Sequence, residues 1–248
     1  MKINIRLLIP LLILFLAYGT RLFYYLDNPI QWRDSFFYKE MVETWERNDE
    51  YPSKDKYNQE NTIPPFPLYI FMLVHKTFHK SIFVSNVSLQ IVLGSITVLV
   101  LWFILREINI GLIPSALICL IAVFHKMFLD FSTQMTRDNL YIFFSSLFLY
   151  TIIKSIKSKK NYYPFLLGVL LAFVYLTRYE GIEFLIVYPA ILAIQKTLVL
   201  KRMCLFFLLF CASFIFTLVS IYYTICPNYN FTIATHVKFK NYYSDLTN

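Results

Sequence analysis

Four groups of polar residues that could do chemistry lie between long apolar segments of the chain. One is a single carboxylate, Asp34, which precedes an amphipathic segment. Ionisable residues at the rim of a membrane helix are costly, so each group is a functional-site hypothesis. The other three groups are Asp130, Gln134, Arg137 and Asp138; Arg178, Glu180 and Glu183; and His75, Lys76 and His79. A carboxylate beside cations suits a lipid-borne phosphate donor, because cations bind phosphate oxygens while the carboxylate accepts a proton from an incoming hydroxyl.

The segments that must position these residues are apolar and long. Hydrophobic residues make up 58% of the 248 positions and charged residues 15%, and the charges form short clusters. Seven apolar runs lie at 7–26, 82–105, 110–129, 139–153, 162–177, 181–195 and 203–226. Most of them can cross a hydrocarbon core of roughly 30 Å as helices, with some tilt. We therefore predict an all-α integral membrane protein with about seven transmembrane helices.

A shorter apolar run at 64–78 decides the predicted topology. It begins with prolines and ends with basic residues, so we expect a juxtamembrane helix on the outer surface. The inner side then has one acid, Glu107, and ten bases: Lys2, Arg6, Arg106, Lys154, Lys157, Lys159, Lys160, Lys196, Lys201 and Arg202. The outer segment 27–63 has nine acids and five bases. This distribution follows the positive-inside rule and predicts that the polar groups converge on the outer face.

The net charge of +8 has the same explanation. Lys and Arg lie at the ends of apolar runs and not along one helical face, so we expect no nucleic-acid partner. Arg21 and the aromatic residues after it are typical of a membrane interface, which indicates a retained first span. We predict a transmembrane module at 1–226 with an external loop at 27–81, followed by an external tail at 227–248.

The first external loop contains a predicted amphipathic helix. Phe37, Met41 and Trp45 recur at intervals of four residues, with charged residues such as Lys39 and Glu43 on the opposite side. This period is typical of a helix with one apolar face. We expect the helix to lie on the outer surface, directly after Asp34.

Four stretches, in order, resemble the GT-C superfamily of membrane glycosyltransferases. The similarity is to the branch of protein O-mannosyltransferases and the lipid A aminoarabinose transferase. The stretches are Trp32–Met41, which has the acidic first-loop motif; Pro64–Tyr69, a proline-aromatic helix start; Phe131–Tyr141; and Leu176–Gly181. Together with the seven-span pattern, the resemblance extends over about residues 1–226.

The resemblance implies an inverting glycosyltransferase on the outer face of a membrane, with a polyprenyl-phosphate sugar as donor of a hexosyl or pentosyl group. It implies Asp34 as catalytic base and Arg178 as a donor-phosphate contact, with Asp138 matching the acid after the third span. Arg137, Glu180 and Tyr69 are the further candidate substrate-binding residues. The acceptor would be a glycan, lipid or protein, and membrane lipids would surround the chain. Bacterial relatives favour a cytoplasmic (inner) membrane with the site outside.

The chain departs from the family pattern beside the expected base. Ser35 follows Asp34 where relatives usually have a second acid, so a bound divalent metal is less expected. We predict neither a metal nor another cofactor. His75 and His79 are four residues apart, as two ligands of one metal could be, but no third ligand lies at a fixed spacing from them. We therefore expect interfacial histidines and no metal site.

Each site residue also has a purely structural alternative. Asp34 could cap the amphipathic helix, and Arg178 could pair with Glu180 or extend to the interface. Arg137 and Asp138 could form a local ion pair. For the whole chain, the alternatives to an enzyme are a non-catalytic membrane subunit and a lipid-carrier transporter.

Overall fold

The computed structural model describes residues 5–48, 51–52, 64–158, 160–194 and 200–225. Within these ranges the chain is helical and contains no strand. The elements are α1 (Ile5–Asp27), α2 (Arg33–Asn48), α3 (Pro65–Phe78), α4 (Ile82–Glu107), α5 (Leu112–Phe124), α6 (Lys126–Thr133), α7 (Arg137–Ser158), α8 (Tyr162–Thr177), the 3-10 helix η1 (Tyr179–Glu183), α9 (Phe184–Ile194) and α10 (Leu200–Ile225). The expected tail at 227–248 lies outside the described residues.

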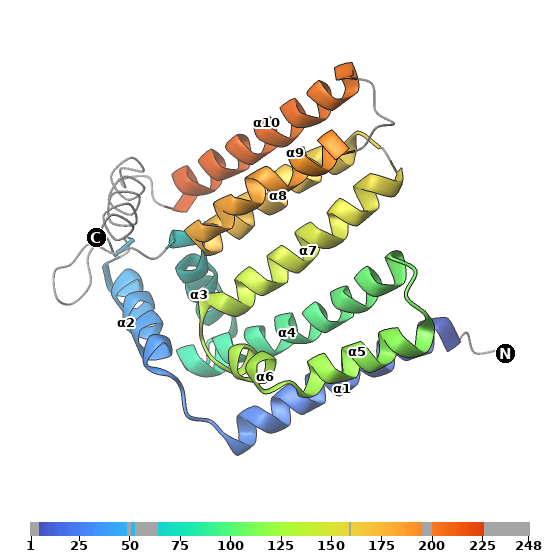
Figure 1. Ribbon diagram of the computed structural model, residues 1–248. Helices are drawn as coiled ribbons and strands as arrows, with labels where there is room; N and C mark the ends of the chain where they lie inside the picture. The colour runs from blue at the N-terminus through green and yellow to red at the C-terminus, as the bar shows by residue number, and fades with distance from the viewer. Residues whose placement is uncertain (1–4, 49–50, 53–63, 159, 195–199, 226–248) are drawn as a thin grey trace, which may run out of the picture.

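The long apolar helices pack side by side (Figure 1). Their order in space is α1, α4, α7, α8 and α10, each in contact with the next. Helix α5 packs on α1 and α4, while α6 packs mainly on α4. Large apolar side chains line these contacts, and burying such side chains is the main stabilising term. Most of each predicted apolar run is helical within the described residues, but seven membrane crossings are not confirmed.

Among the residues that the structure describes, four helices are long and apolar enough to cross a membrane, over Leu8–Asp27, Ile82–Glu107, Arg137–Ser158 and Met203–Ile225. The run expected as one span at 110–129 is instead two helices, α5 and α6, bent by 56°. The break occurs at His125, whose backbone is extended with ψ of 120°. Counted as one broken span, this pair gives a fifth crossing. Helix α8 has 16 residues and is about 24 Å long, shorter than a typical bilayer core.

Helices α2 and α3 pack across one end of this bundle (Figure 1). The predicted amphipathic helix is confirmed as α2, which buries Tyr38, Met41, Val42 and Trp45. Its opposite side has an exposed Lys39–Glu43 ion pair at 2.8 Å. Helix α3 buries its proline-rich first turns against α4, α8 and α10. The depth of both helices relative to a bilayer stays a prediction.

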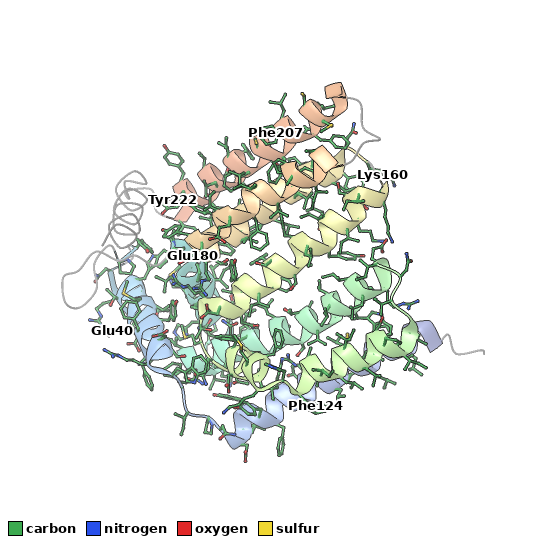
Figure 2. The ribbon with its side chains drawn as sticks, in the orientation of Figure 1. Glu40, Phe124, Lys160, Glu180, Phe207 and Tyr222 are labelled. Atoms are coloured by element: carbon green, nitrogen blue, oxygen red, sulfur yellow. The ribbon has the colours of Figure 1, made fainter. Side chains whose placement is uncertain are left out.

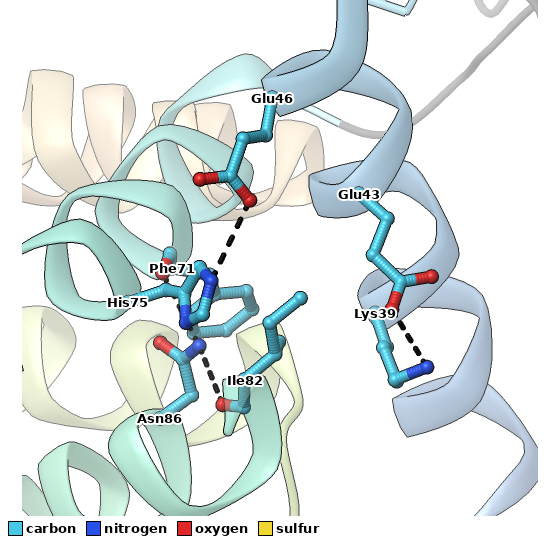
Figure 3. Close-up of polar contacts among 7 residues, drawn as sticks. All are labelled: Lys39, Glu43, Glu46, Phe71, His75, Ile82 and Asn86. Carbon is cyan, nitrogen blue, oxygen red and sulfur yellow. Dashed lines mark hydrogen bonds and ion pairs between the residues drawn. The ribbon is translucent and has the colours of Figure 1, made fainter. Parts of the chain in front are cut away.

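Polar side chains fasten α2, α3 and α4 to one another (Figure 3). His75 of α3 lies 3.5 Å from the Glu46 carboxylate of α2. Buried Asn86 of α4 donates to the carbonyl oxygens of Phe71 (3.2 Å) and Ile82 (2.9 Å). The Phe71 carbonyl belongs to α3, so one amide joins two helices at the end of the bundle.

The two ends of the bundle differ in charge. Glu40 and Glu180 lie toward one end in Figure 2, and Lys160 lies at the other. At the Lys160 end, the Glu107 carboxylate forms ion pairs with the Nζ atoms of Lys154 at 2.7 Å and Lys157 at 3.3 Å. The described part of the chain therefore separates the basic turns from the acidic first loop, as the sequence predicted.

Candidate active site

Asp34 lies in the first turn of α2 with an exposed side chain. Its carboxylate faces no cation within ion-pair distance and accepts no hydrogen bond from the described residues. Because α2 begins at Arg33, Asp34 is inside the helix and is not its N-cap, so the capping alternative is wrong. Its charge still benefits from the positive end of the helix dipole. The carboxylate is therefore open to solvent.

Two glutamines fix the start of α2 against the α6–α7 junction. The Gln134 side chain accepts from the Trp32 backbone N–H at 2.7 Å and donates to the Ile30 carbonyl at 3.0 Å. Gln31 reciprocates, donating to the Thr133 carbonyl at 3.1 Å and accepting from the Met135 N–H at 3.2 Å. We call this pair the glutamine clasp. It joins the loop before Asp34 to the loop before Arg137.

The first turn of α7 contains Arg137 and Asp138, and a buried amide pair holds this turn against α4. Asn139 donates to the backbone and side-chain oxygens of Gln90, both at 2.8 Å. Gln90 in turn donates to the Thr136 carbonyl at 2.8 Å. Buried amides that are hydrogen-bonded in this way define one arrangement of the backbone.

Arg178 follows the end of α8 and joins α7 by an ion pair. Its Nη1 lies 2.5 Å from the Asp138 carboxylate, and its Nε lies 3.7 Å from Glu180. The guanidinium also lies over the Tyr141 ring, 5.6 Å from the centroid. The alternative of a local Arg137–Asp138 pair is wrong, because Asp138 pairs with Arg178. Arg137 makes no ion pair with the described residues.

One buried phenol connects these groups. Burial raises the pKa of Tyr38 to about 12, and the charges of Arg137, Asp138, Asp34 and Arg178 also act on it. All four charged side chains therefore lie within electrostatic range of a single hydroxyl. The Tyr38 hydroxyl makes no hydrogen bond with the described residues.

The structure thus brings together the predicted residues of three separate turns at one end of the bundle. The charges of Asp34, Arg137, Asp138 and Arg178 all act on Tyr38, and we call these five residues the Tyr38 cluster. The expected role of Tyr69 stays a prediction; its ring packs 6.1 Å from that of Trp45.

Sequence reasoning missed Tyr38 because it considered the apolar side of this helix, defined by Phe37, Met41 and Trp45, only as a packing surface. The available signal was its position four residues after Asp34, which puts both residues on one side of a helix.

Asp130, another predicted polar residue, has different surroundings. Asp130 accepts a hydrogen bond from the Tyr24 hydroxyl at 2.5 Å, so it fastens α6 to α1. No group of three or more His, Cys, Asp or Glu residues with metal-binding geometry lies in the described part of the chain. The absence of a cofactor stays a prediction.

Fold and site together define a helical membrane protein with an acid, two guanidinium groups and a phenol gathered at one end of its bundle. The family model described as dolichyl-phosphate-mannose-protein mannosyltransferase matches residues 62–223. The chain belongs to this family and is a membrane glycosyltransferase of the GT-C type. No curated protein matches the chain significantly.

The matched range divides the Tyr38 cluster. Arg137, Asp138 and Arg178 lie within residues 62–223, whereas Asp34 and Tyr38 precede them. Both cations therefore lie within the family match, and the glutamine clasp holds the loop before Asp34 against the loop before Arg137.

Proposed function

We propose that the chain transfers a hexosyl or pentosyl group from a polyprenyl-phosphate donor to an acceptor hydroxyl, with inversion at the anomeric carbon. The reaction would take place at the Tyr38 cluster, on the external face of the membrane. The segregation of basic residues to the opposite end of the bundle supports this orientation. The acceptor class, whether glycan, lipid or protein, is left open by the proposal.

The observation that supports the proposal most strongly is the convergence on Tyr38. A carboxylate and two guanidinium groups, from turns far apart in the sequence, lie within electrostatic range of the Tyr38 side chain, and Arg178 is oriented there by its ion pair with Asp138 at 2.5 Å. Transfer from a lipid phosphate requires a base for the acceptor and cations for the departing phosphate. Asp34 has no cation partner among the described residues, so its carboxylate is not occupied by an ion pair.

In the proposed step, Asp34 accepts the proton of the acceptor hydroxyl as its oxygen attacks the anomeric carbon. A new carbon–oxygen bond forms on one face of the sugar while the bond to the phosphate oxygen breaks on the other. The electron pair leaves with the phosphate, and the proton remains on Asp34 until solvent removes it. Attack opposite to the leaving group inverts the anomeric configuration.

Two guanidinium groups would stabilise the negative charge that develops on the departing phosphate. Arg137 is unpaired with the described residues and can offer its N–H groups directly. Arg178 is oriented by Asp138 at 2.5 Å and keeps other N–H groups for the phosphate. Planar guanidinium groups suit phosphate oxygens because they donate two parallel hydrogen bonds.

The test is transferase activity of Asp34→Asn in the purified full chain, measured as polyprenyl phosphate released from a polyprenyl-phosphate sugar. Asn has nearly the same shape but cannot accept the proton, so we expect a loss of about 100-fold or more. Glu43→Gln is the matched control, because Glu43 is on the opposite side of α2 and pairs with Lys39. Wild-type release by Asp34→Asn would refute the base assignment.

The same assay separates the alternatives to an enzyme. A non-catalytic subunit would bind the polyprenyl-phosphate sugar and release no polyprenyl phosphate. A lipid-carrier transporter would move the intact donor across vesicles without breaking the sugar–phosphate bond. Either result with the wild-type chain would contradict the proposed reaction.

A further inference from the structure

Arg21 of α1 is buried inside the helical bundle without a carboxylate partner. The residue is 1% exposed, although the sequence placed it at a membrane interface. Its Nη1 donates to the Ala17 carbonyl of its own helix at 3.1 Å, and its Nε has no hydrogen-bond partner. No acid among the described residues lies within ion-pair distance of it. Arginine stays charged at neutral pH, so this is a buried, uncompensated cation.

Gly94 of α4 leaves the room that the guanidinium occupies. A Cβ at this position would lie 2.9 Å from Arg21 Nε and 2.5 Å from Ser132 Cβ. Both separations are shorter than van der Waals contact. The close approach of α1, α4 and α6 at this point therefore depends on a residue without a side chain.

A cavity of about 110 Å³ adjoins the guanidinium. Arg21 and Gly94 line it together with Asn139 and Ser146 of α7. Most of the remaining wall is apolar, and it includes Val98, Leu101, Ala122, Phe128 and Ile142. None of the lining residues belongs to the Tyr38 cluster.

Hydrogen-bond donors other than Arg21 in this wall are already used. Ser146 donates to the Ile142 carbonyl at 2.7 Å, and both donors of Asn139 go to Gln90. Thr97 likewise donates to the Leu93 carbonyl at 2.8 Å. Arg21 is the only charged residue among the described residues that line the cavity, so the wall favours an anion over a neutral polar ligand.

We propose that this cavity binds the phosphate group of an anionic lipid, with Arg21 as its cation. The phosphate would accept hydrogen bonds from Arg21 and neutralise the buried charge, while the hydrocarbon chain lies against the apolar wall and continues into the bilayer. Phosphate suits the site because a guanidinium binds two of its oxygens at once. The shared chemistry is a phosphate oxyanion, whether free or esterified to a lipid.

The cavity volume limits what the phosphate can be attached to. A cavity of about 150 Å³ accepts benzene, so 110 Å³ accommodates a phosphate group but no sugar ring beside it. The site therefore takes a lipid phosphate without a sugar. This distinguishes it from the donor site of the proposed function, and the inference does not depend on that function.

The experiment measures binding of farnesyl phosphate, a short prenyl monophosphate, to the purified full chain in detergent. Because Arg178 is a proposed contact for a second lipid phosphate, the comparison is made in an Arg178→Ala background. We expect Arg21→Gln to weaken the remaining binding about tenfold or more, since it removes the charge but keeps much of the length. Unchanged binding in the double variant would overturn the proposal.

Two further measurements sharpen the result. Ser146→Leu fills the cavity from a helix-compatible position and leaves Arg21 in place, so it should also weaken binding even if Arg21→Gln does not fold. Farnesol, which lacks the phosphate, should not compete, and equal competition by farnesol would contradict the role of Arg21. Competition by inorganic phosphate at similar concentration would identify a free oxyanion as the occupant; its absence would identify a lipid. A loss of binding caused by Arg178→Ala alone would report on the donor site of the proposed transferase and not on the Arg21 cavity.

Discussion

At the scale of single residues, the molecule places a free acid and a free phenol beside two guanidinium groups. The sequence predicted Asp34, Arg137, Asp138 and Arg178 as candidates by residue type and position. It could not predict which charges pair, because the Arg178–Asp138 contact at 2.5 Å joins residues 40 positions apart. It also could not predict the burial of Arg21, which depends on the absence of a side chain at Gly94.

Tyr38 is the residue of the cluster on which all four charged side chains act. Its ring packs against Phe71 in the core of the α2–α3 end, and its hydroxyl is within range of the charged groups. Burial raises the pKa to about 12, so the hydroxyl is protonated at neutral pH and can donate a hydrogen bond. The stability that this neutral form contributes is complete below pH 10 and is lost as the pH rises through about 12.

We predict that Tyr38→Phe lowers kcat/KM about tenfold while leaving stability nearly unchanged. The substitution keeps the buried ring and removes only the donor to substrate, which is worth about 1–1.5 kcal/mol. Steady-state kinetics and thermal unfolding measure the two effects. Tyr223→Phe is the control, because Tyr223 is largely exposed on α10. Equal kinetics for wild type and Tyr38→Phe would show that the hydroxyl contacts no substrate.

At the scale of elements, the apolar runs predicted helices well, and helix α2 has the buried face that its period indicated. The break between α5 and α6 was missed because hydropathy reports where a chain is apolar and says little about backbone torsion at His125. The number of spans also depends on whether each apolar helix is long enough to cross the bilayer core. Helix α8 has the composition of a span but only 16 residues.

The contact between α8 and α10 gives a sharp prediction for one glycine. A Cβ at Gly168 would collide with Ser213 Oγ and the Phe210 carbonyl of α10, whereas one at Gly19 would meet nothing within 4 Å. We expect Gly168→Ala to destabilise the bundle by about 1–3 kcal/mol, because the helices must move apart. Gly19→Ala should be neutral or slightly stabilising, since Ala favours helix.

Thermal unfolding of the two glycine variants in the same detergent measures this difference. Both substitutions add one methyl group within an apolar helix, so lipid and detergent effects are matched. Equal unfolding temperatures would contradict the tight α8–α10 contact.

At the scale of the whole molecule, the charge pattern predicted which turns share an end. Asp34, Arg137 and Arg178 come together around Tyr38, and the Glu107–Lys154 pair marks the opposite end. The grouping of turns at one end was predictable because alternating spans leave a statistical record in the distribution of Lys and Arg. Side-chain pairing within one end leaves no such record, since it depends on helix rotation and tilt.

The proposed orientation predicts opposite labelling of two asparagines. Asn28 follows α1 and Asn161 precedes α8, and both are exposed at opposite ends of the bundle. In a background without the native cysteines, Asn28→Cys should react with a membrane-impermeant maleimide in intact cells. Asn161→Cys should react only after permeabilisation. The reverse pattern would place the Tyr38 cluster on the inner side.

The glutamine clasp has a mechanical consequence for catalysis. Four hydrogen bonds connect the backbone on either side of Gln31 with that on either side of Gln134, so the two loops shift as one piece. If a bulky lipid-linked sugar tilts α2 as it enters, the loop before Arg137 moves with α2. The distance between the Asp34 carboxylate and the Arg137 guanidinium is then kept. Helix α2 can thus move to admit the substrate while Asp34 and Arg137 stay aligned with each other.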